Sequence, residues 1–432
     1  MGTGNNADPC ADVLSHPSGG ELSSPDIQVE QYSSKAIIRP PGGPALELRL
    51  RDEDYLRKRV TLFAHAVERK RPLGLPVERT TARDFLSFAK EKAYHCFVEC
   101  TFDDMEKLQA AREVFEKHIG IKSGSQRAPQ IEIRSYGAQY LPWEWLGSRD
   151  CHTDLEAEAM ALLGFAAVVY RRDVYRENQN GRSEFLTAQP MQVRFFRHPD
   201  LASTEQECRF FKFSRVEAEP SMPAFRLLGP LPEPGSMLAL AEQLVDPLYC
   251  APDGPDQVVH LSCDHKTDKD PRKISAYELA LLESTLSFGD EERHRIKVTD
   301  LEDGLADSKG AAEAVERPLV FFNGCRGDFH PFAAESVAGA LLRNRNRAVV
   351  STSIKVPDDV AAEFGRFFYR RLLGGKTSAE ALQYAKWDLL YTRGSPLGLV
   401  YTYYGQPALH VAPTADIPPS WRSPAPMGGL CA

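Results

Sequence analysis

Three short apolar runs constrain the fold of this chain more than any other feature. QVVHLSC at 257–263, RPLVFFNGC at 317–325 and AVVSTSI at 348–354 have the pattern of strands buried on both faces. Such strands are typical of a parallel sheet that helices cover on its two sides. Strongly amphipathic helical patterns follow at 360–373 and 378–390. This alternation predicts an α/β fold with a mostly parallel sheet.

The chain is expected to form two α/β halves. Helix and strand patterns alternate along its length, and turn-rich segments at 173–190 and 214–236 interrupt them. We expect an N-terminal half over residues 37–213 and a C-terminal half over 214–412, which share or abut one sheet. RIKVTDL at 295–301 is expected to be a strand of the second half.

The two ends of the chain have a different composition. Residues 1–36 are rich in Gly, Ser, Asn, Asp and Pro, and residues 413–432 form a Pro-rich tail. Segments of this kind bury too little apolar surface to offset their chain entropy. We therefore expect both to be disordered.

The overall composition is that of a soluble globular protein. Hydrophobic residues make up 42% and charged residues 26% of the chain, and the formal net charge is −8. The sequence has no basic stripe of the kind that indicates nucleic-acid binding. It also has no apolar stretch long enough to span a membrane. The first residues lack the pattern of a signal peptide. Nine cysteines without an export signal indicate free thiols in a reducing compartment, so we expect a cytoplasmic protein.

Cys96 and Cys100, with His95 beside them, are the one sequence pattern that suggests a metal site. The three-residue gap between the cysteines is unusual for zinc, and no second pair lies nearby. Inert buried thiols are the favoured interpretation, and we expect neither a metal nor a cofactor.

Reactive side chains follow two of the buried strands. The first strand is followed by Asp264 and His265, and the second by Cys325. Because ligands bind outside the carboxyl ends of parallel strands, neighbouring strands would bring His265 and Cys325 to one crevice. An imidazole can take the proton of a thiol and return it to a leaving amine. Gly324 and the backbone of Cys325 can form a turn whose N–H groups hold an oxyanion.

Each of these residues also has an ordinary structural interpretation. A cysteine at a strand end is often a small buried apolar residue. His260 is a second candidate base, but it lies inside its strand and is interpreted as a packed core histidine. Asp328 either binds a basic side chain of a substrate or is a solvated loop acid.

Five motifs together resemble the CHAT domains, which are relatives of caspases and separases. YLPWEWL resembles the family's LPWE segment, VVHLSCDH its histidine strand, and PLVFFNGCRGD the strand that carries its nucleophile. The stretch AVVSTSIKVPDDVAAEFGRFFYRRLLGGKTSAEAL and the closing YTYYGQPAL are similar to the segments that follow. The resemblance covers roughly residues 130 to 411. It implies a caspase-like three-layer α/β/α sandwich, with a pseudo-caspase half and a catalytic half, that cuts peptide bonds without a metal or cofactor.

One position departs from the family's pattern. In the family, the catalytic histidine comes directly after the cysteine of the histidine-strand motif and is followed by glycine. In this chain, Cys263 of VVHLSCDH is followed by Asp264, then His265 and Lys266. A shift of one residue would let His265 act as the base. Strict register would put an aspartate in its place and yield a catalytically inactive copy.

The resemblance therefore implies a cysteine endopeptidase with a Cys325–His265 dyad. Relatives act in regulated proteolysis, such as prokaryotic antiviral defence or programmed cell death. A protein or peptide substrate and a regulatory protein or sensor partner are expected. The alternative is a catalytically inactive CHAT-fold scaffold or adaptor that binds a partner protein. A nucleotide-binding protein is disfavoured because the chain has no phosphate-binding loop motif.

Overall fold

The computed structural model describes most of the chain between residues 25 and 411. The described residues are 25–102, 105–120, 128–136, 141–148, 150, 152–173, 185–186, 192–201, 203–213, 226–228, 240, 243–245, 248, 257–267, 284–307, 317–324 and 331–411. None of the helices in these ranges is long and apolar enough to cross a membrane.

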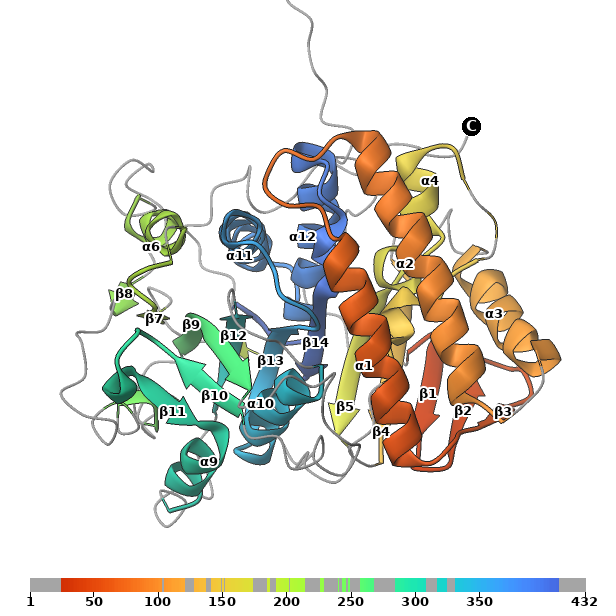
Figure 1. Ribbon diagram of the computed structural model, residues 1–432, viewed down its shortest axis with the longest axis horizontal. Helices are drawn as coiled ribbons and strands as arrows, with labels where there is room; N and C mark the ends of the chain where they lie inside the picture. Colours follow the sequence, from red (N-terminus) through yellow and green to blue (C-terminus); the bar gives the residue numbers. More distant parts are fainter. Residues whose placement is uncertain are drawn as a thin grey trace, which may run out of the picture.

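The first part of the chain places three long helices between its strands. Its elements are β1 (Ile27–Gln31), β2 (Lys35–Arg39), β3 (Leu46–Arg49), α1 (Glu53–Lys70), α2 (Arg79–Cys100), α3 (Met105–Gly120), β4 (Gln130–Ser135), η1 (Trp143–Trp145), α4 (Leu155–Met160), α5 (Leu163–Ala166) and β5 (Val168–Asp173). The helices α1 and α2 pack side by side (Figure 1).

The second part alternates strands and helices more regularly. Its elements are β6 (Phe185–Leu186), β7 (Gln192–Arg197), α6 (Thr204–Phe213), β8 (Arg226–Leu228), β9 (Gln257–Thr267), β10 (Ser284–Ser287), η2 (Glu292–His294), β11 (Arg295–Lys297), α9 (Val298–Asp307), β12 (Arg317–Gly324), α10 (Pro331–Arg343), β13 (Asn346–Thr352), α11 (Asp358–Leu373), α12 (Ser378–Arg393), η4 (Pro396–Val400), β14 (Tyr401–Gly405) and β15 (His410–Val411).

Local sequence explains where the helices begin and end. The Asp52 side chain accepts a hydrogen bond from the Tyr55 N–H and caps α1. Thr377 and Glu380 form a reciprocal capping box at the start of α12. Gly394 ends α12 in the left-handed region, with φ of 67°, and a Cβ there would lie 2.1 Å from the Val77 carbonyl oxygen.

One sheet runs through both parts of the molecule. Its strand order is β11-β10-β9-β12-β13-β14-β5-β4-β1-β2-β3, and β7 and β8 extend it beside β9. The pairs of β7, β9, β12 and β13 are parallel, as are those of β14, β5, β4 and β1, whereas β14 runs antiparallel to β13. The halves therefore share a mostly parallel sheet, as the sequence predicts, and β14 joins them.

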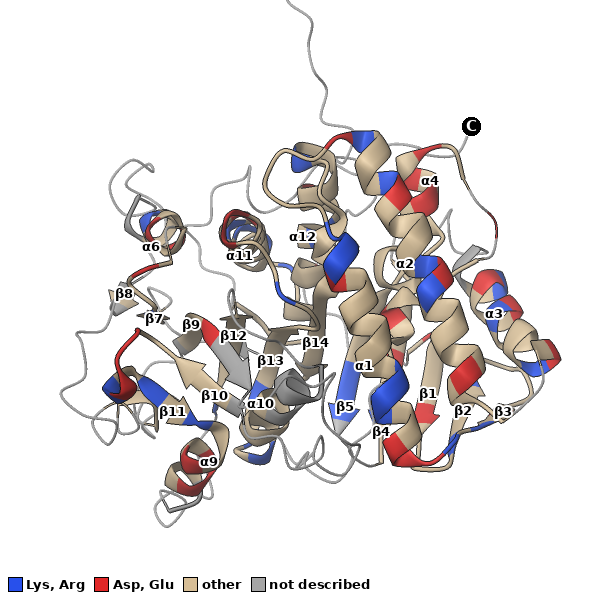
Figure 2. Ribbon diagram, viewed as in Figure 1, with Lys and Arg blue, Asp and Glu red and all other residues tan. Residues whose placement is uncertain are grey.

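Both faces of the sheet are covered. Alternate residues of β12 enter two different apolar clusters: Leu319 and Phe321 belong to one, Val320 and Phe322 to the other. The helices α6 and α11 contribute to the first cluster, and α9 and α10 to the second. The predicted α/β/α sandwich is thus confirmed. Acidic and basic residues intermingle on the outer helices (Figure 2).

Three sequence predictions need correction. Residues 27–31 and 35–36 form strands rather than part of a disordered tail, because alternating residues of β1 are buried against the core. The segment 192–213 was assigned to the N-terminal half, but β7 pairs with β9 and α6 packs on α11. In 295–301, only the first three residues form a strand, and α9 begins at Val298.

A buried ion pair fixes the segment that contains the LPWE motif to the sheet. Arg171 of β5 donates from Nε and Nη2 to the two Glu144 carboxylate oxygens, at 3.0 and 2.8 Å, and also to the Leu141 carbonyl oxygen. Trp143 and Trp145 are buried on either side of Glu144 and anchor this segment in the core.

Lys386 of α12 is buried close to this pair. Its Nζ donates to the Gly164 carbonyl oxygen at 3.3 Å. Burial lowers the pKa of Lys386 to about 8, against a smaller opposing effect of the Glu144 charge. The group is therefore neutral in the fold and charged in the unfolded chain between about pH 8 and its ordinary value of 10.5.

We expect Lys386→Met to stabilise the fold at pH 7. Below pH 8 the native state bears the cost of a charged buried amine, and this cost disappears as the pH rises towards 10.5. The free energy of unfolding of the variant minus that of the wild type should fall by about 3 kcal/mol between pH 7 and pH 10.5. Urea unfolding at both pH values measures this difference. A difference that does not change with pH would contradict the prediction.

Candidate active site

The candidate site lies at the carboxyl end of β9 and β12. These strands are parallel neighbours, with His260 opposite Phe321 and Cys263 opposite Gly324. Gly324 is the last residue of β12, and Cys325 follows it directly in the chain. The predicted adjacency of the two strand ends is confirmed, whereas Cys325 and Asp328 lie outside the described residues.

The strand β9 changes its outer neighbour at this edge. Up to Ser262 it pairs with β7, and from Asp264 onward it pairs with β10. The backbone of His265 lies opposite Leu286 of β10, and its side chain is not among those described. The sequence predicted that His265 follows the strand, but this candidate base lies within β9 and is part of a strand pair.

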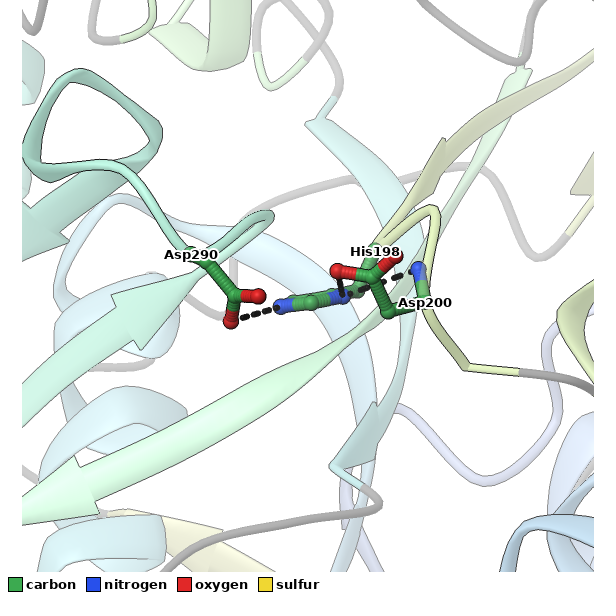
Figure 3. A group of neighbouring side chains, drawn as sticks. All are labelled: His198, Asp200 and Asp290. Carbon is green, nitrogen blue, oxygen red and sulfur yellow. Dashed lines mark hydrogen bonds and ion pairs between the residues drawn. The ribbon is translucent and has the colours of Figure 1, made fainter.

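Four polar side chains meet where β7 and β10 both end. His198 directly follows β7, and Asp290 follows β10 (Figure 3). The His198 Nε2 atom lies 4.0 Å from both the Asp290 Oδ1 and Asp264 Oδ2 atoms. On the other edge of the ring, Nδ1 accepts the Asp200 N–H at 3.2 Å, and the Asp200 carboxylate lies 4.0 Å away.

The hydrogen bond from the Asp200 N–H sets the tautomer of the neutral His198 ring, which is buried. The His198 side chain is 0% and the Asp264 side chain 5% exposed, whereas the side chains of Asp200 and Asp290 are 55% and 81% exposed. Because Nδ1 accepts a hydrogen bond, the neutral ring carries its hydrogen on Nε2, facing Asp264 and Asp290.

Within the described residues, ligand atoms of His198, Asp200 and Asp290 lie close enough together to hold a metal ion. Metal binding requires an imidazole lone pair directed at the ion. Here the Nδ1 lone pair accepts the Asp200 N–H and Nε2 carries the hydrogen. The arrangement therefore suits an imidazole flanked by carboxylates better than a metal ligand.

A buried polar network lies beneath the end of β12. The Asn323 side-chain amide donates to the Glu207 Oε1 atom at 2.5 Å and to the Ala361 carbonyl oxygen at 3.1 Å. The Tyr401 hydroxyl donates to the Asn323 Oδ1 atom at 2.8 Å. Buried amides bonded on both ends allow few alternative arrangements, so the network fixes the strand two residues before Cys325.

His260 belongs to the same network and is a core residue. It is fully buried, and its ring stacks on Phe195 and Phe321. Its Nδ1 atom lies 3.0 Å from the Tyr369 hydroxyl, and its Nε2 atom 3.6 Å from a Glu207 oxygen. Burial and the nearby Glu207 charge raise the pKa of Tyr369 well above its ordinary value, so the phenol keeps its proton. The prediction of a packed core histidine is confirmed.

The surroundings of Cys263 and Cys96 keep their thiols protonated and therefore unreactive. Burial raises the pKa of the Cys263 thiol well above its ordinary value. A hydrogen bond with Cys100, at 3.9 Å between the sulfur atoms, and burial raise that of Cys96. His95 is 60% exposed and faces Glu91. The interpretation of Cys96 and Cys100 as inert buried thiols agrees with this geometry.

The strand order defines an α/β protein with a mostly parallel sheet, and its candidate site lies at the carboxyl end of β9 and β12. A family model described as CHAT domain matches residues 126–428, more than half of the sequence. The chain therefore belongs to the CHAT-domain family, as the motifs predicted. No curated protein matches the sequence.

Solved structures with a similar fold are distant in sequence. A crystal structure of the Saccharomyces cerevisiae separase–securin complex has a TM-score of 0.46 and 9% identity, over 88% of this chain but 30% of that chain. The Arg-specific cysteine proteinase gingipain R has a TM-score of 0.41 and 10% identity, over 71% of this chain and 68% of that one. This chain thus spans less than a third of the separase chain, and similarity at this level carries no argument about activity.

Sequence reasoning missed His198, Asp200 and Asp290. A signal for the first two existed, because the strand pattern MQVRFF is followed by RHPD, a histidine and an aspartate around a proline turn. His265 and Cys325 were selected because reactive side chains that directly follow buried strands lie at the ligand-binding edge of a parallel sheet. The same reasoning applies to the end of the strand before His198.

Proposed function

We propose that the chain is a cysteine endopeptidase in which Cys325 is the nucleophile. The observation that carries the proposal is the in-register pairing of β9 and β12, which puts Gly324 opposite Cys263 at an edge that also holds an imidazole and carboxylates. Membership of the CHAT family supports the same reaction class. Thiolate attack on a peptide carbonyl would give a thioester that water hydrolyses.

The reaction needs an oxyanion site and a base near the sulfur. The backbone N–H groups around Gly324 and Cys325 are proposed to hold the oxyanion. The proposal requires one imidazole at this edge, and His265 is the histidine that the sequence predicts for it. Asp328 is proposed to face the substrate. No metal or cofactor takes part in this reaction scheme.

The biological setting is proposed from the family alone. Regulated proteolysis, such as prokaryotic antiviral defence or programmed cell death, would use a protein or peptide substrate. A separate regulatory or sensor protein would control the activity, and the cytoplasm would keep the thiol reduced.

Cleavage of a peptide library by the wild type, Cys325→Ala and His265→Ala tests the proposal. Cleavage by the wild type that is lost in Cys325→Ala supports a peptidase. If the wild type cuts nothing and Cys325 does not react with peptidyl electrophiles, the alternative scaffold function is correct. The substitution of the family's histidine by Asp264 is the observation that favours this alternative.

A further inference from the structure

A cavity in the N-terminal half is separate from the candidate active site. It has a volume of about 200 Å³ and lies between α3, the segment 146–148 after η1, and the turn from α4 to α5. The helix α3 packs on β3, which is the last strand at one end of the sheet, whereas β9 lies near the other end (Figure 1). A molecule bound in this cavity would therefore be remote from the carboxyl ends of β9 and β12.

Hydrogen bonds tie the walls of the cavity together. The Ser148 N–H donates to the Ala161 carbonyl oxygen at 2.9 Å, which joins the segment 146–148 to the end of α4. The buried Arg112 of α3 donates from Nε to the Gly147 carbonyl oxygen at 2.7 Å. A Cβ at Gly147 would lie 2.3 Å from the Ala161 carbonyl oxygen, so this close approach requires glycine. The three walls are therefore fixed by the fold before any molecule binds.

The inner lining of the cavity is apolar. Its buried apolar side chains are those of Phe115, Leu146, Leu162, Leu163 and Ala166. Met160 also lines the cavity and is 43% exposed, so it lies at the mouth. Apolar walls without a neighbour lose packing contacts, and water gains few hydrogen bonds against them. The lining therefore favours an apolar occupant.

The volume of the cavity decides between two kinds of occupant. Pockets for small molecules typically measure about 300–1,000 Å³. A cavity of about 200 Å³ is smaller than this range. It suits one large apolar side chain, which is the kind of anchor that supplies most of the binding energy at protein interfaces. The unbranched Met160 side chain at the mouth can adapt to the shape of such an anchor.

Glu116 gives the mouth of the cavity a negative charge. Its side chain lines the cavity and is exposed, and none of the basic residues that the structure describes forms an ion pair with it. Asp150, two residues after Ser148, is exposed as well. The Arg112 guanidinium is only 2% exposed and donates to the Gly147 carbonyl and Gln109 side-chain oxygens. The charge that an approaching molecule meets is thus acidic, and it complements a basic partner.

Deepening the regulation by a partner proposed above, we propose that this cavity is a docking site for a separate protein. The partner inserts one leucine, methionine or phenylalanine side chain into the cavity and places a neighbouring lysine or arginine against Glu116. It thereby binds the N-terminal half, remote from the edge where peptide cleavage is proposed. The inference rests on the proposed function only for the regulatory role of the partner, because docking itself needs no peptidase activity.

Selection of random dodecapeptides displayed on phage, with the full chain immobilised, tests the proposal. Phage that bind the variant Ala161→Phe are removed first, because the added ring fills the cavity from its own lining. The peptides then enriched on the wild type should share a leucine, methionine or phenylalanine next to a lysine or arginine. A lack of enrichment after this counter-selection, or enriched peptides without a basic residue, would overturn the proposal.

Reversal of the charge at the mouth gives a second measurement. An enriched peptide is labelled with fluorescein, and its Kd is measured by fluorescence anisotropy at low salt. Glu116→Lys should raise this Kd about tenfold, because repulsion replaces attraction. Glu113→Lys is the matched control, since Glu113 is exposed on the same helix but does not line the cavity, and it should change the Kd by less than about twofold. Equal Kd values for Glu116→Lys and the wild type would refute the role of Glu116.

Two further readouts separate this proposal from its alternatives. Light scattering that shows a dimer of the wild type and a monomer of Ala161→Phe would assign the cavity to a second copy of the chain and contradict docking of a separate protein. The melting temperature shows that each variant is folded. Because the measured quantity is peptide binding, a wild type that cuts no peptide counts against the proposed function and not against the docking site.

Discussion

Replacement of Cys325 by alanine is expected to abolish peptide cleavage and labelling by a peptidyl electrophile. The sulfur is the only atom of this side chain that can form the thioester, and alanine offers no substitute nucleophile. Removal of a catalytic nucleophile typically lowers kcat by more than about 10⁴-fold, so residual turnover should fall to the background rate. Active-site titration followed by peptide hydrolysis measures both quantities.

Cys263 provides the matched control for this experiment. It lies in β9 opposite the residue that precedes Cys325, but it is fully buried and its thiol pKa is raised well above the ordinary value by burial. Cys263→Ala should therefore keep labelling and turnover within a few-fold of the wild type in the folded fraction. Labelling that follows Cys263 and not Cys325 would show that the nucleophile has been assigned wrongly.

Arg171→Met should cause the largest loss of stability among single changes at the junction of the halves. The guanidinium and the Glu144 carboxylate are 4% and 1% exposed and form two hydrogen bonds with each other. The change leaves Glu144 as an uncompensated buried charge, which typically costs about 3–5 kcal/mol. The free energy of unfolding from urea denaturation measures this loss.

An exposed ion pair of the same sheet serves as comparison. Lys35 and Glu47 of β2 and β3 lie 3.0 Å apart, but their side chains are 39% and 49% exposed. Lys35→Met should cost less than about 1 kcal/mol, because water screens and solvates such pairs. If Arg171→Met costs no more than Lys35→Met, the ion pair does not fix the LPWE segment to the sheet.

The strands at the centre of the C-terminal half could be predicted from sequence because their signal is local. The apolar runs before Cys263 and Cys325 are continuous, and parallel pairing buries both of their faces. His260 was recognisable as a core residue because it lies within such a run. The end of β12 at Gly324 followed from the same reasoning.

The rest of the site depends on pairing between distant segments. The change of partner of β9 between Ser262 and Asp264 requires β7 and β10, which are separated by more than 80 residues of sequence. No periodicity within β9 encodes this change. His198 and Asp290 therefore meet only because two strands that are distant in sequence both end at one point of β9. A pattern read along the chain does not reveal such a meeting.

The position of β14 has a consequence for the order in which the protein forms. Its residues, Tyr401–Gly405, come near the end of the described chain, yet they fill the gap between β13 and β5 in the middle of the sheet. Until residue 405 has left the ribosome, β5 and β13 each present an unpaired edge. The nascent polypeptide can therefore complete its central sheet only after both candidate catalytic strands, β9 and β12, have been synthesised. The hydrogen bond from Tyr401 to Asn323 also forms only at that stage.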